Sequence, residues 1–365
     1  MKKFMIKLLY FLPLLLLVAG FNFIVDPWSQ FKNDEDVKKM VDALLSGTAA
    51  TNLKNDNFDC RVEQKLMIQS LKHKIDIGVF GSSRVATISS EMFPGKILLN
   101  TELSANSLQD DVILYEMYRE KGILPSNIII GIDPWIFNKN TDHYTWKEFG
   151  QYYARFNNWG PGDLFDLKTW QENLIPYKYQ LLVNHFYTLT SIQYLLHPCA
   201  HNLFSATDQR YNEKMTYLPD GSWTWDRQSR ESSVLDVRKI VEEDNFHPYN
   251  ITGFSKLDED YKQEFVKLIK TMKNDGVRVI LFLPPYHPMA YDWFVHSRNF
   301  RIIEDVEIYV RKIAKIYGLT LVGSYNPHLM SIPESSFFDS VHLRDDKELI
   351  KIFSPLNLSS TKQAR

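Results

Sequence analysis

Five short apolar runs along the chain alternate with segments whose apolar residues recur at helical spacing. Runs of this kind, with no polar face, are typical of strands buried on both sides of a parallel sheet. The runs cover residues 75–80, 97–100, 128–132, 277–283 and 319–322. Helical periodicity predicts helices over about 104–121, 258–276, 302–317 and 345–353. This alternation predicts an α/β fold with a doubly wound, flavodoxin-like parallel sheet of five strands.

Two stretches depart from this alternation. Residues 28–70 are a polar lead-in, with helical spacing from Asp34 to Leu45. Residues 138–250 are rich in Tyr, Trp, Asn and His, and include a predicted helix over 181–196 and a predicted short strand over 223–225. We interpret 138–250 as a large insertion over the active face of one α/β domain that spans 71–355. A polar tail over 356–365 follows.

The amino-terminal 27 residues have the charge and hydropathy pattern of a membrane-spanning segment. Met1–Lys3 is basic, and Leu8–Val25 contains no charged residue. Counted from Phe4, the run reaches the roughly 20 residues that a spanning helix needs, and the flanking lysines favour a cytoplasmic amino end. We therefore predict a single-pass membrane anchor over 1–27, with the rest of the chain exported to the periplasm or cell surface. A cleaved signal peptide and a buried helix of a soluble protein are the alternatives, although Phe21–Phe23 lacks the small residues of a cleavage site.

Composition narrows the class of protein. The net charge is −2 and the pI about 6.6, which argues against a nucleic-acid binder. Aromatic residues make up 14% of the chain, which suits either sugar stacking or ordinary packing. Cys60 and Cys199 either form one disulfide outside the cytoplasm or are both reduced and buried. The histidines show no ligand spacing, so we expect neither a metal nor another cofactor.

The chemistry is predicted at two distant segments. Gly81–Arg84 follows the first strand, where a small-residue turn can expose the hydroxyl of Ser83 above the edge of the sheet. Asp339 and His342, three residues apart, can hold the imidazole on one side of a turn so that its other nitrogen faces a serine. Together they predict a Ser-His-Asp site. Ser82 is the alternative nucleophile.

Structural roles compete with this interpretation. Ser83 and Asp339 are also residue types that cap helices, and His342 can be an ordinary packed surface histidine.

These landmarks resemble the SGNH (GDSL-like) hydrolase superfamily over about residues 75–350. They look most like its membrane-anchored extracytoplasmic branch, which includes the D-alanyl transfer protein of teichoic acid modification and SGNH-type polysaccharide O-acetyltransferases. The resemblance implies that Ser83, in Gly81–Ser83, is the nucleophile and that His342 is the base, oriented by Asp339.

The same resemblance implies an oxyanion hole from three donors: the N–H of the nucleophile, a Gly after the second strand and an Asn after the third. Here those positions hold Ala105, which keeps a backbone N–H, and Asp133, whose carboxylate accepts hydrogen bonds and cannot donate one. Either Asn106 substitutes, or the site is weaker, or the carboxylate of Asp133 does another job.

Three further residues have two readings each. Arg84 can pair with an anionic substrate or form a structural salt bridge. His287, after the fourth strand, can contact substrate or pack within its loop. Trp135 can form the floor of a sugar-binding subsite or pack in the core.

Three functions stay open. The first is an extracytoplasmic serine-dependent acyl-ester transferase or esterase that acts on a cell-envelope polysaccharide. The second is a catalytically inactive relative that binds glycan or an acyltransferase. The third is a membrane-anchored structural protein in which the three residues coincide by chance. The expected partners are the membrane, an envelope glycan or polyol polymer and, for transfer, a membrane-bound O-acyltransferase.

Overall fold

The computed structural model describes most of the chain. The described residues are 2–27, 31, 35–53, 60–141, 143, 145–159, 177–196, 204–244, 249–251, 253–297, 300–356 and 358.

A five-stranded parallel sheet forms the centre of the molecule, in the order β3-β2-β4-β8-β9. This order is that of a flavodoxin-like core, so the predicted α/β class and sheet are confirmed. Each strand lies within two residues of its predicted position. The strands are β2 (Ile77–Phe80), β3 (Leu98–Asn100), β4 (Asn127–Gly131), β8 (Arg278–Leu283) and β9 (Thr320–Gly323).

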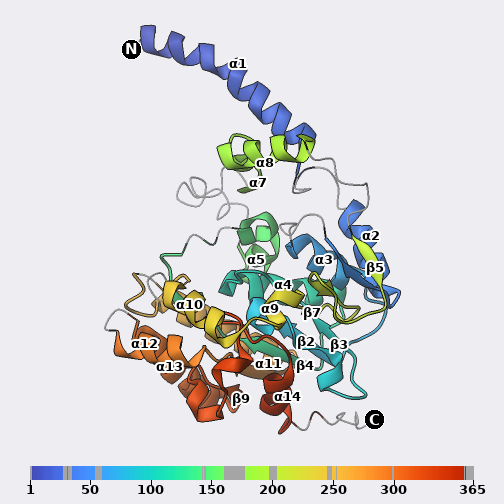
Figure 1. Cartoon of the computed structure of the whole chain (residues 1–365), viewed down its shortest axis with the longest axis vertical. Coiled ribbons are helices and arrows are strands. Elements are labelled where there is room, and N and C mark those ends of the chain that lie inside the picture. The colour runs from blue at the N-terminus through green and yellow to red at the C-terminus, as the bar shows by residue number, and fades with distance from the viewer. Residues whose placement is uncertain are drawn as a thin grey trace.

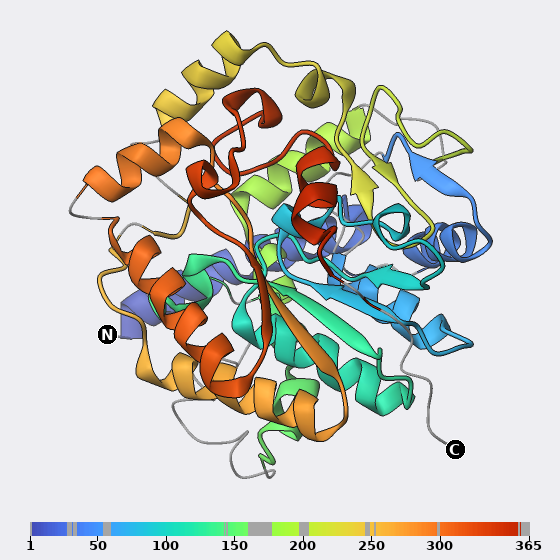
Figure 2. The ribbon, with the colours of Figure 1, turned by 90° about the horizontal axis from the view of Figure 1, so that it is seen from below.

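Alternate residues of each strand enter two separate apolar cores. Ile128 and Ile130 of β4 pack with the helices of one face, whereas Ile129 packs on the other. The first face is covered by α4 (Leu108–Lys121), α11 (Glu259–Asn274) and α13 (Ile302–Tyr317), and the second by α14 (Lys347–Phe353) and short turns. Figure 2 shows the three long helices on one side of the strands and α14 on the other.

Helix α4 begins later than the predicted residue 104. The side chain of Ser107 accepts a hydrogen bond from the Asp110 N–H while the Asp110 carboxylate accepts one from the Ser107 N–H. This capping box fixes the first turn, so residues 104–107 form a loop at the carboxyl end of β3.

A second, antiparallel sheet joins the lead-in to the insertion. Its order is β5-β1-β6-β7, from β5 (Ser205–Thr207), β1 (Ala49–Thr51), β6 (Thr216–Tyr217) and β7 (Trp223–Thr224). The short strand predicted near Trp223 is therefore confirmed. The lead-in strand β1 was not predicted, because its three residues gain strand character only by pairing with segments far along the chain.

The remaining helices flank these sheets. The helix predicted over 181–196 is found over His185–Leu196, and Leu181 is instead the last residue of a short preceding helix. Asn184 accepts hydrogen bonds from the Phe186 and Tyr187 N–H groups, which caps the first turn of the longer helix. The longer elements are α2 (Glu35–Leu45), α3 (Cys60–Ser70), α5 (Gly150–Phe156), α7 (Tyr177–Leu181), α8 (His185–Leu196), α9 (Arg227–Arg230), α10 (Val234–Asp244) and α12 (Pro288–His296). The 3₁₀ turns are η1 (Ser83–Val85), η2 (Ser90–Met92), η3 (Pro134–Phe137), η4 (Thr145–Phe149), η6 (Pro327–Met330) and η7 (Glu334–Ser336).

The amino-terminal segment forms α1 (Lys2–Val25), which projects from one end of the molecule (Figure 1). Across the part of the chain that the structure describes, no helix combines the length and the apolar character needed to cross a bilayer. The predicted membrane-spanning anchor over 1–27 is therefore not found.

The end of β9 offers a test of how closely the sheet edge is packed. Gly323 has φ +79°, and a Cβ there would clash with Leu283 O. Gly276 has a similar φ of +78° but open space around its Cβ position. We expect Gly276→Ala to cost about 1–2 kcal/mol of unfolding free energy from backbone strain alone, and Gly323→Ala about 1–3 kcal/mol more from the clash. Equal losses by urea denaturation would contradict the close approach of Gly323 to Leu283 O.

Candidate active site

Ser83, His342 and Asp339 form a continuous hydrogen-bonded chain. The Ser83 Oγ and His342 Nε2 atoms are 2.8 Å apart, although 259 residues separate them in sequence. His342 Nδ1 lies 2.6 Å from Asp339 Oδ2. A proton on Nδ1, donated to the carboxylate, leaves Nε2 to accept the Ser83 hydroxyl proton. The two segments predicted to carry the chemistry therefore meet, with the geometry of a Ser-His-Asp triad.

The turn after β2 decides which serine faces the imidazole. Ser82 caps η1, since its Oγ accepts a hydrogen bond from the Arg84 N–H, and its side chain is buried. Ser83 occupies the first position of η1 and is half-buried. Gly81 makes the turn possible, because it adopts φ +140° and a Cβ would lie 3.1 Å from Gly131 O. The capping role belongs to Ser82, which leaves Ser83 as the reactive candidate.

The loop that carries Asp339 and His342 is closed on itself. Phe337 and Leu343 pair as an antiparallel bridge at its base. Asp339 Oδ1 accepts hydrogen bonds from the N–H groups of Val341 at 2.8 Å and His342 at 2.7 Å, while Oδ2 pairs with the imidazole. Asp339 thus caps its own turn and orients the histidine.

These contacts also set the charge of Asp339. Burial by itself raises the pKa of this carboxyl, but the adjacent His342 and the two N–H donors outweigh burial and hold the pKa below its ordinary value. The carboxylate is therefore ionised at neutral pH, as the partner of an imidazolium must be.

Aromatic rings of the insertion and the loop enclose the imidazole. The ring of Phe338 stacks on that of His342, with centroids 5.5 Å apart and planes 6° apart. The ring centroids of Trp225 and His342 are 4.8 Å apart, and those of Trp223 and Trp225 are 4.4 Å apart. The sequence singled out neither tryptophan as a site residue. The pairing of β6 with β7 brings them here.

Asp133 is buried in an ion pair and is not placed to donate to an oxyanion. Its Oδ1 lies 2.9 Å from Arg84 Nη1, and both side chains are 1% exposed. Burial raises the pKa of Asp133, while Arg84 and a hydrogen bond from Ser82 oppose that rise. The donor expected after the third strand is therefore replaced by a structural carboxylate.

Arg84 has its guanidinium donors occupied within the protein. Nη2 donates to Pro284 O at 2.6 Å and to Pro285 O at 2.8 Å, and Nε donates to Val341 O at 3.2 Å. The guanidinium also lies over the ring of Tyr286, 4.2 Å from its centroid. Of its two predicted roles, the structural salt bridge holds and contact with an anionic substrate does not.

The other oxyanion candidates differ from each other. Asn106 is buried, and its amide donates to Asp111 Oδ1 at 3.0 Å, so it is engaged elsewhere. Ala105 is half-buried and adopts φ +58°, a left-handed conformation. Among the described residues, the N–H groups of Ser83 and Ala105 have no hydrogen-bond acceptor. These two backbone donors remain the candidates.

His287 and Trp135 are not available to a substrate. His287 is buried, caps α12 through Nδ1, and donates its backbone N–H to Ser340 O at 3.0 Å. Burial lowers the pKa of His287. Trp135 is buried and donates from Nε1 to Asn106 O at 3.0 Å. Both side chains pack within loops around the site, which is the second of the two roles considered for each residue.

Two buried carboxyls near the site were missed by sequence reasoning. Glu102 follows β3 and accepts a hydrogen bond from Trp223 Nε1 at 2.9 Å. Burial raises its pKa to about 7, against that hydrogen bond, Arg61 and His342, which lower it. Burial and then Glu102 raise the pKa of Glu63 to about 8. No pattern marks these residues, because a lone Glu in sequence gives no sign of its burial.

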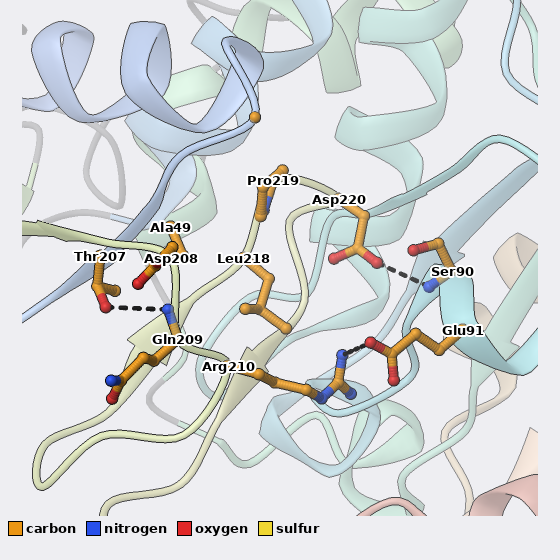
Figure 3. A pocket seen from close by; sticks show the side chains of 11 residues that line it. Ala49, Ser90, Glu91, Thr207, Asp208, Gln209, Arg210, Leu218, Pro219 and Asp220 are labelled. Carbon is orange, nitrogen blue, oxygen red and sulfur yellow. Dashed lines mark hydrogen bonds and ion pairs between the residues drawn. The ribbon is translucent and has the colours of Figure 1, made fainter.

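A separate pocket of about 310 Å³ lies beside the second sheet (Figure 3). It is formed by Gly47, Ala49, Ser90, Glu91, Thr207, Asp208, Gln209, Arg210, Leu218, Pro219 and Asp220. Its arginine is held by ion pairs with Glu91 at 3.1 Å and Asp346 at 3.0 Å. None of the three triad residues lines this pocket.

Two further sequence expectations concern cysteines and metals. Cys60 is the first residue of α3, whereas Cys199 lies outside the described residues, so both alternatives for the two cysteines, a disulfide and two reduced thiols, stay open. Within the described ranges, no group of three or more His, Cys, Asp or Glu side chains is placed to hold a metal ion.

Comparisons with known proteins give no family assignment. No family model matches the chain, and no curated protein matches it.

The Arg84–Asp133 pair gives a test by stability. Arg84→Met strands a buried carboxylate and three carbonyl acceptors, so we expect unfolding free energy to fall by about 3–5 kcal/mol in urea denaturation. Arg84→Met/Asp133→Leu removes the stranded charge and should recover part of that loss. A double variant as unstable as Arg84→Met would contradict the role of the carboxylate.

The Glu63 carboxyl gives a test by pH. Its pKa is about 8 in the folded protein against 4.5 when exposed, so folding requires proton uptake between these values. This group therefore lowers stability progressively as pH rises from about 4.5 to 8, and no further above that range. We expect Glu63→Gln to flatten the decline in unfolding free energy over this range and to exceed the unsubstituted protein in stability on the alkaline side. Parallel pH profiles for the two proteins would contradict this.

Proposed function

We propose that this chain is a serine-dependent acyl-ester hydrolase or transferase. The observation that carries the proposal is the hydrogen-bonded chain from Ser83 Oγ through His342 to Asp339, with donor–acceptor distances of 2.8 and 2.6 Å. Its position adds support. Ser83 follows β2 at the carboxyl edge of the sheet, next to the point where the strand order reverses. Open α/β sheets bind their ligands there.

In the proposed reaction, Ser83 Oγ attacks the carbonyl carbon of an ester while His342 Nε2 takes the hydroxyl proton. Asp339 stabilises the imidazolium that results. Collapse of the tetrahedral intermediate breaks the ester bond, and the leaving alcohol takes the proton back from Nε2. Water or a second alcohol then attacks the acyl-serine with His342 again as base, which releases the acid or a new ester and restores Ser83.

The oxyanion of this intermediate would be held by backbone donors. The N–H groups of Ser83 and Ala105 are the proposed pair, since Asp133 and the amide of Asn106 are engaged in other contacts. Loss of one donor typically costs about 2.7–4 kcal/mol of transition-state stabilisation. A two-donor hole therefore suits a reactive ester better than an amide.

The resemblance to SGNH-type enzymes points to a sugar or polyol hydroxyl of an extracytoplasmic envelope polymer as the acceptor. An acyltransferase that supplies the acyl group would then be the partner.

A second candidate is a catalytically inactive glycan-binding relative. The observation that favours it is the Asp133–Arg84 ion pair at the position where the family resemblance expects a donor.

The test is hydrolysis of a small chromogenic acetyl ester by the purified full chain. We expect measurable turnover that falls by about 10⁴-fold or more in Ser83→Ala and in His342→Ala, because these variants remove the proposed nucleophile and the proposed base.

Ser82→Ala is the matched control, since Ser82 lies next to the nucleophile but its side chain caps η1 and hydrogen-bonds Asp133. It should keep most of the activity. Turnover that persists in Ser83→Ala and disappears in Ser82→Ala would reverse the assignment. An inactive chain that still binds envelope glycan would favour the second candidate.

A further inference from the structure

Helices α1 and α8 pack against each other through polar groups. Asn22 of α1 donates from Nδ2 to Leu182 O and to Thr188 Oγ1, both at 2.8 Å. Ser191 of α8 donates to Asn22 Oδ1 at 3.1 Å. Tyr187 donates from its hydroxyl to Asp26 Oδ1 at 2.7 Å. Asn22, Tyr187 and Ser191 are fully buried, so the contact between the helices is a closed hydrogen-bond network.

The outward faces of the same helices are apolar. On α8, Phe186, Leu189 and Leu196 are 59%, 54% and 70% exposed. Side chains of α1 are described from Leu12 onward, and they show the same character. We call the following exposed residues the α1–α8 surface: Leu12, Leu14, Leu15, Leu16, Leu17, Phe23, Ile24, Val183, Phe186, Leu189, Ile192, Tyr194, Leu195 and Leu196.

The α1–α8 surface combines many exposed apolar side chains with helical segments that carry no Asp, Glu, Lys or Arg. On α13, by contrast, the exposed apolar residues Ile308 and Ile316 lie on a helix that also carries acidic and basic side chains. Helix α8 contains no Asp, Glu, Lys or Arg, and neither does Leu8–Val25. Exposed apolar residues gathered on two helices that pack against each other mark an interaction site.

We propose that the α1–α8 surface binds a lipid bilayer. Polar groups between the helices and apolar groups outside are the arrangement that a hydrocarbon environment favours, because hydrogen bonds hold helices together where lipid already surrounds the apolar side chains. A protein partner would more commonly meet a mixed rim of polar residues. Lys2, Lys3 and Lys7 give the amino end of α1 a positive charge, which complements anionic lipid head groups.

The proposal concerns contact with a bilayer, not a crossing of it, and it is independent of the catalytic proposal. Figure 1 shows α8 beside the carboxyl-terminal end of α1, at the end of the molecule away from the parallel sheet. Lipid contact there would leave the Ser83 site exposed to its substrate.

The test places an environment-sensitive probe on α8 itself, because α1 could bind lipid without it. In a Cys60→Ser/Cys199→Ser background, Leu189→Cys is labelled with a nitrobenzoxadiazole group in the full-length protein. Vesicles of phosphatidylcholine mixed with phosphatidylglycerol are then added. We expect brighter, blue-shifted emission that brominated lipids quench. The matched control is the same label at Ile308→Cys, an equally apolar and exposed site (65%) on α13, which should not respond.

Each other outcome overturns the proposal. Emission at residue 189 that ignores vesicles shows that α8 does not contact lipid. Emission that changes with protein concentration and not with lipid assigns the surface to a second copy of the chain. Equal responses at 189 and 308 indicate non-specific adsorption. Circular dichroism checks that each labelled protein is folded, and Leu196→Cys replaces Leu189→Cys if the latter is not.

Discussion

A buried ion pair between Arg84 and Asp133 lies beneath the candidate site and connects the segments that form it. Arg84 follows β2 and Asp133 follows β4, while the other contacts of the guanidinium reach the backbone after β8 and the loop after β9. Burying two charges is costly by itself, and such a pair is stable only when its remaining hydrogen-bonding groups are satisfied. Here the carbonyl groups of Pro284, Pro285 and Val341 satisfy the guanidinium.

This constraint explains how a triad can form from residues so far apart in the chain. Val341, held by Arg84, is the residue before His342, and Ser83 is the residue before Arg84. One side chain therefore fixes the loop of the base relative to the turn of the nucleophile. Two further contacts hold Ser340 of the same loop, from the His287 N–H and from the Asp244 carboxylate. Restraint from several elements is what a catalytic geometry requires, since small displacements of a base sharply reduce its effect.

The buried polar groups near the candidate site differ in kind from those between α1 and α8. Around the site, carboxyls are buried beside aromatic rings, and Glu102 is connected through Trp223 to the tryptophan that packs on His342. Between α1 and α8, polar side chains form a buried hydrogen-bond network and apolar side chains face outward. The first arrangement suits chemistry in a restricted environment, and the second suits an apolar surrounding medium.

The sequence by itself determined the parallel sheet, because its strands are buried on both faces and carry an uninterrupted apolar signal, as in Ile128–Ile130. It also pointed to Ser83, Asp339 and His342, since their chemistry depends on residue type at fixed local spacing. Only the tertiary structure decided between roles that share a residue type. Burial made Arg84, Asp133, His287 and Trp135 structural, and long-range pairing created β1 and brought Trp225 to the imidazole. Burial and pairing depend on what other segments place around a residue, and no local pattern records that.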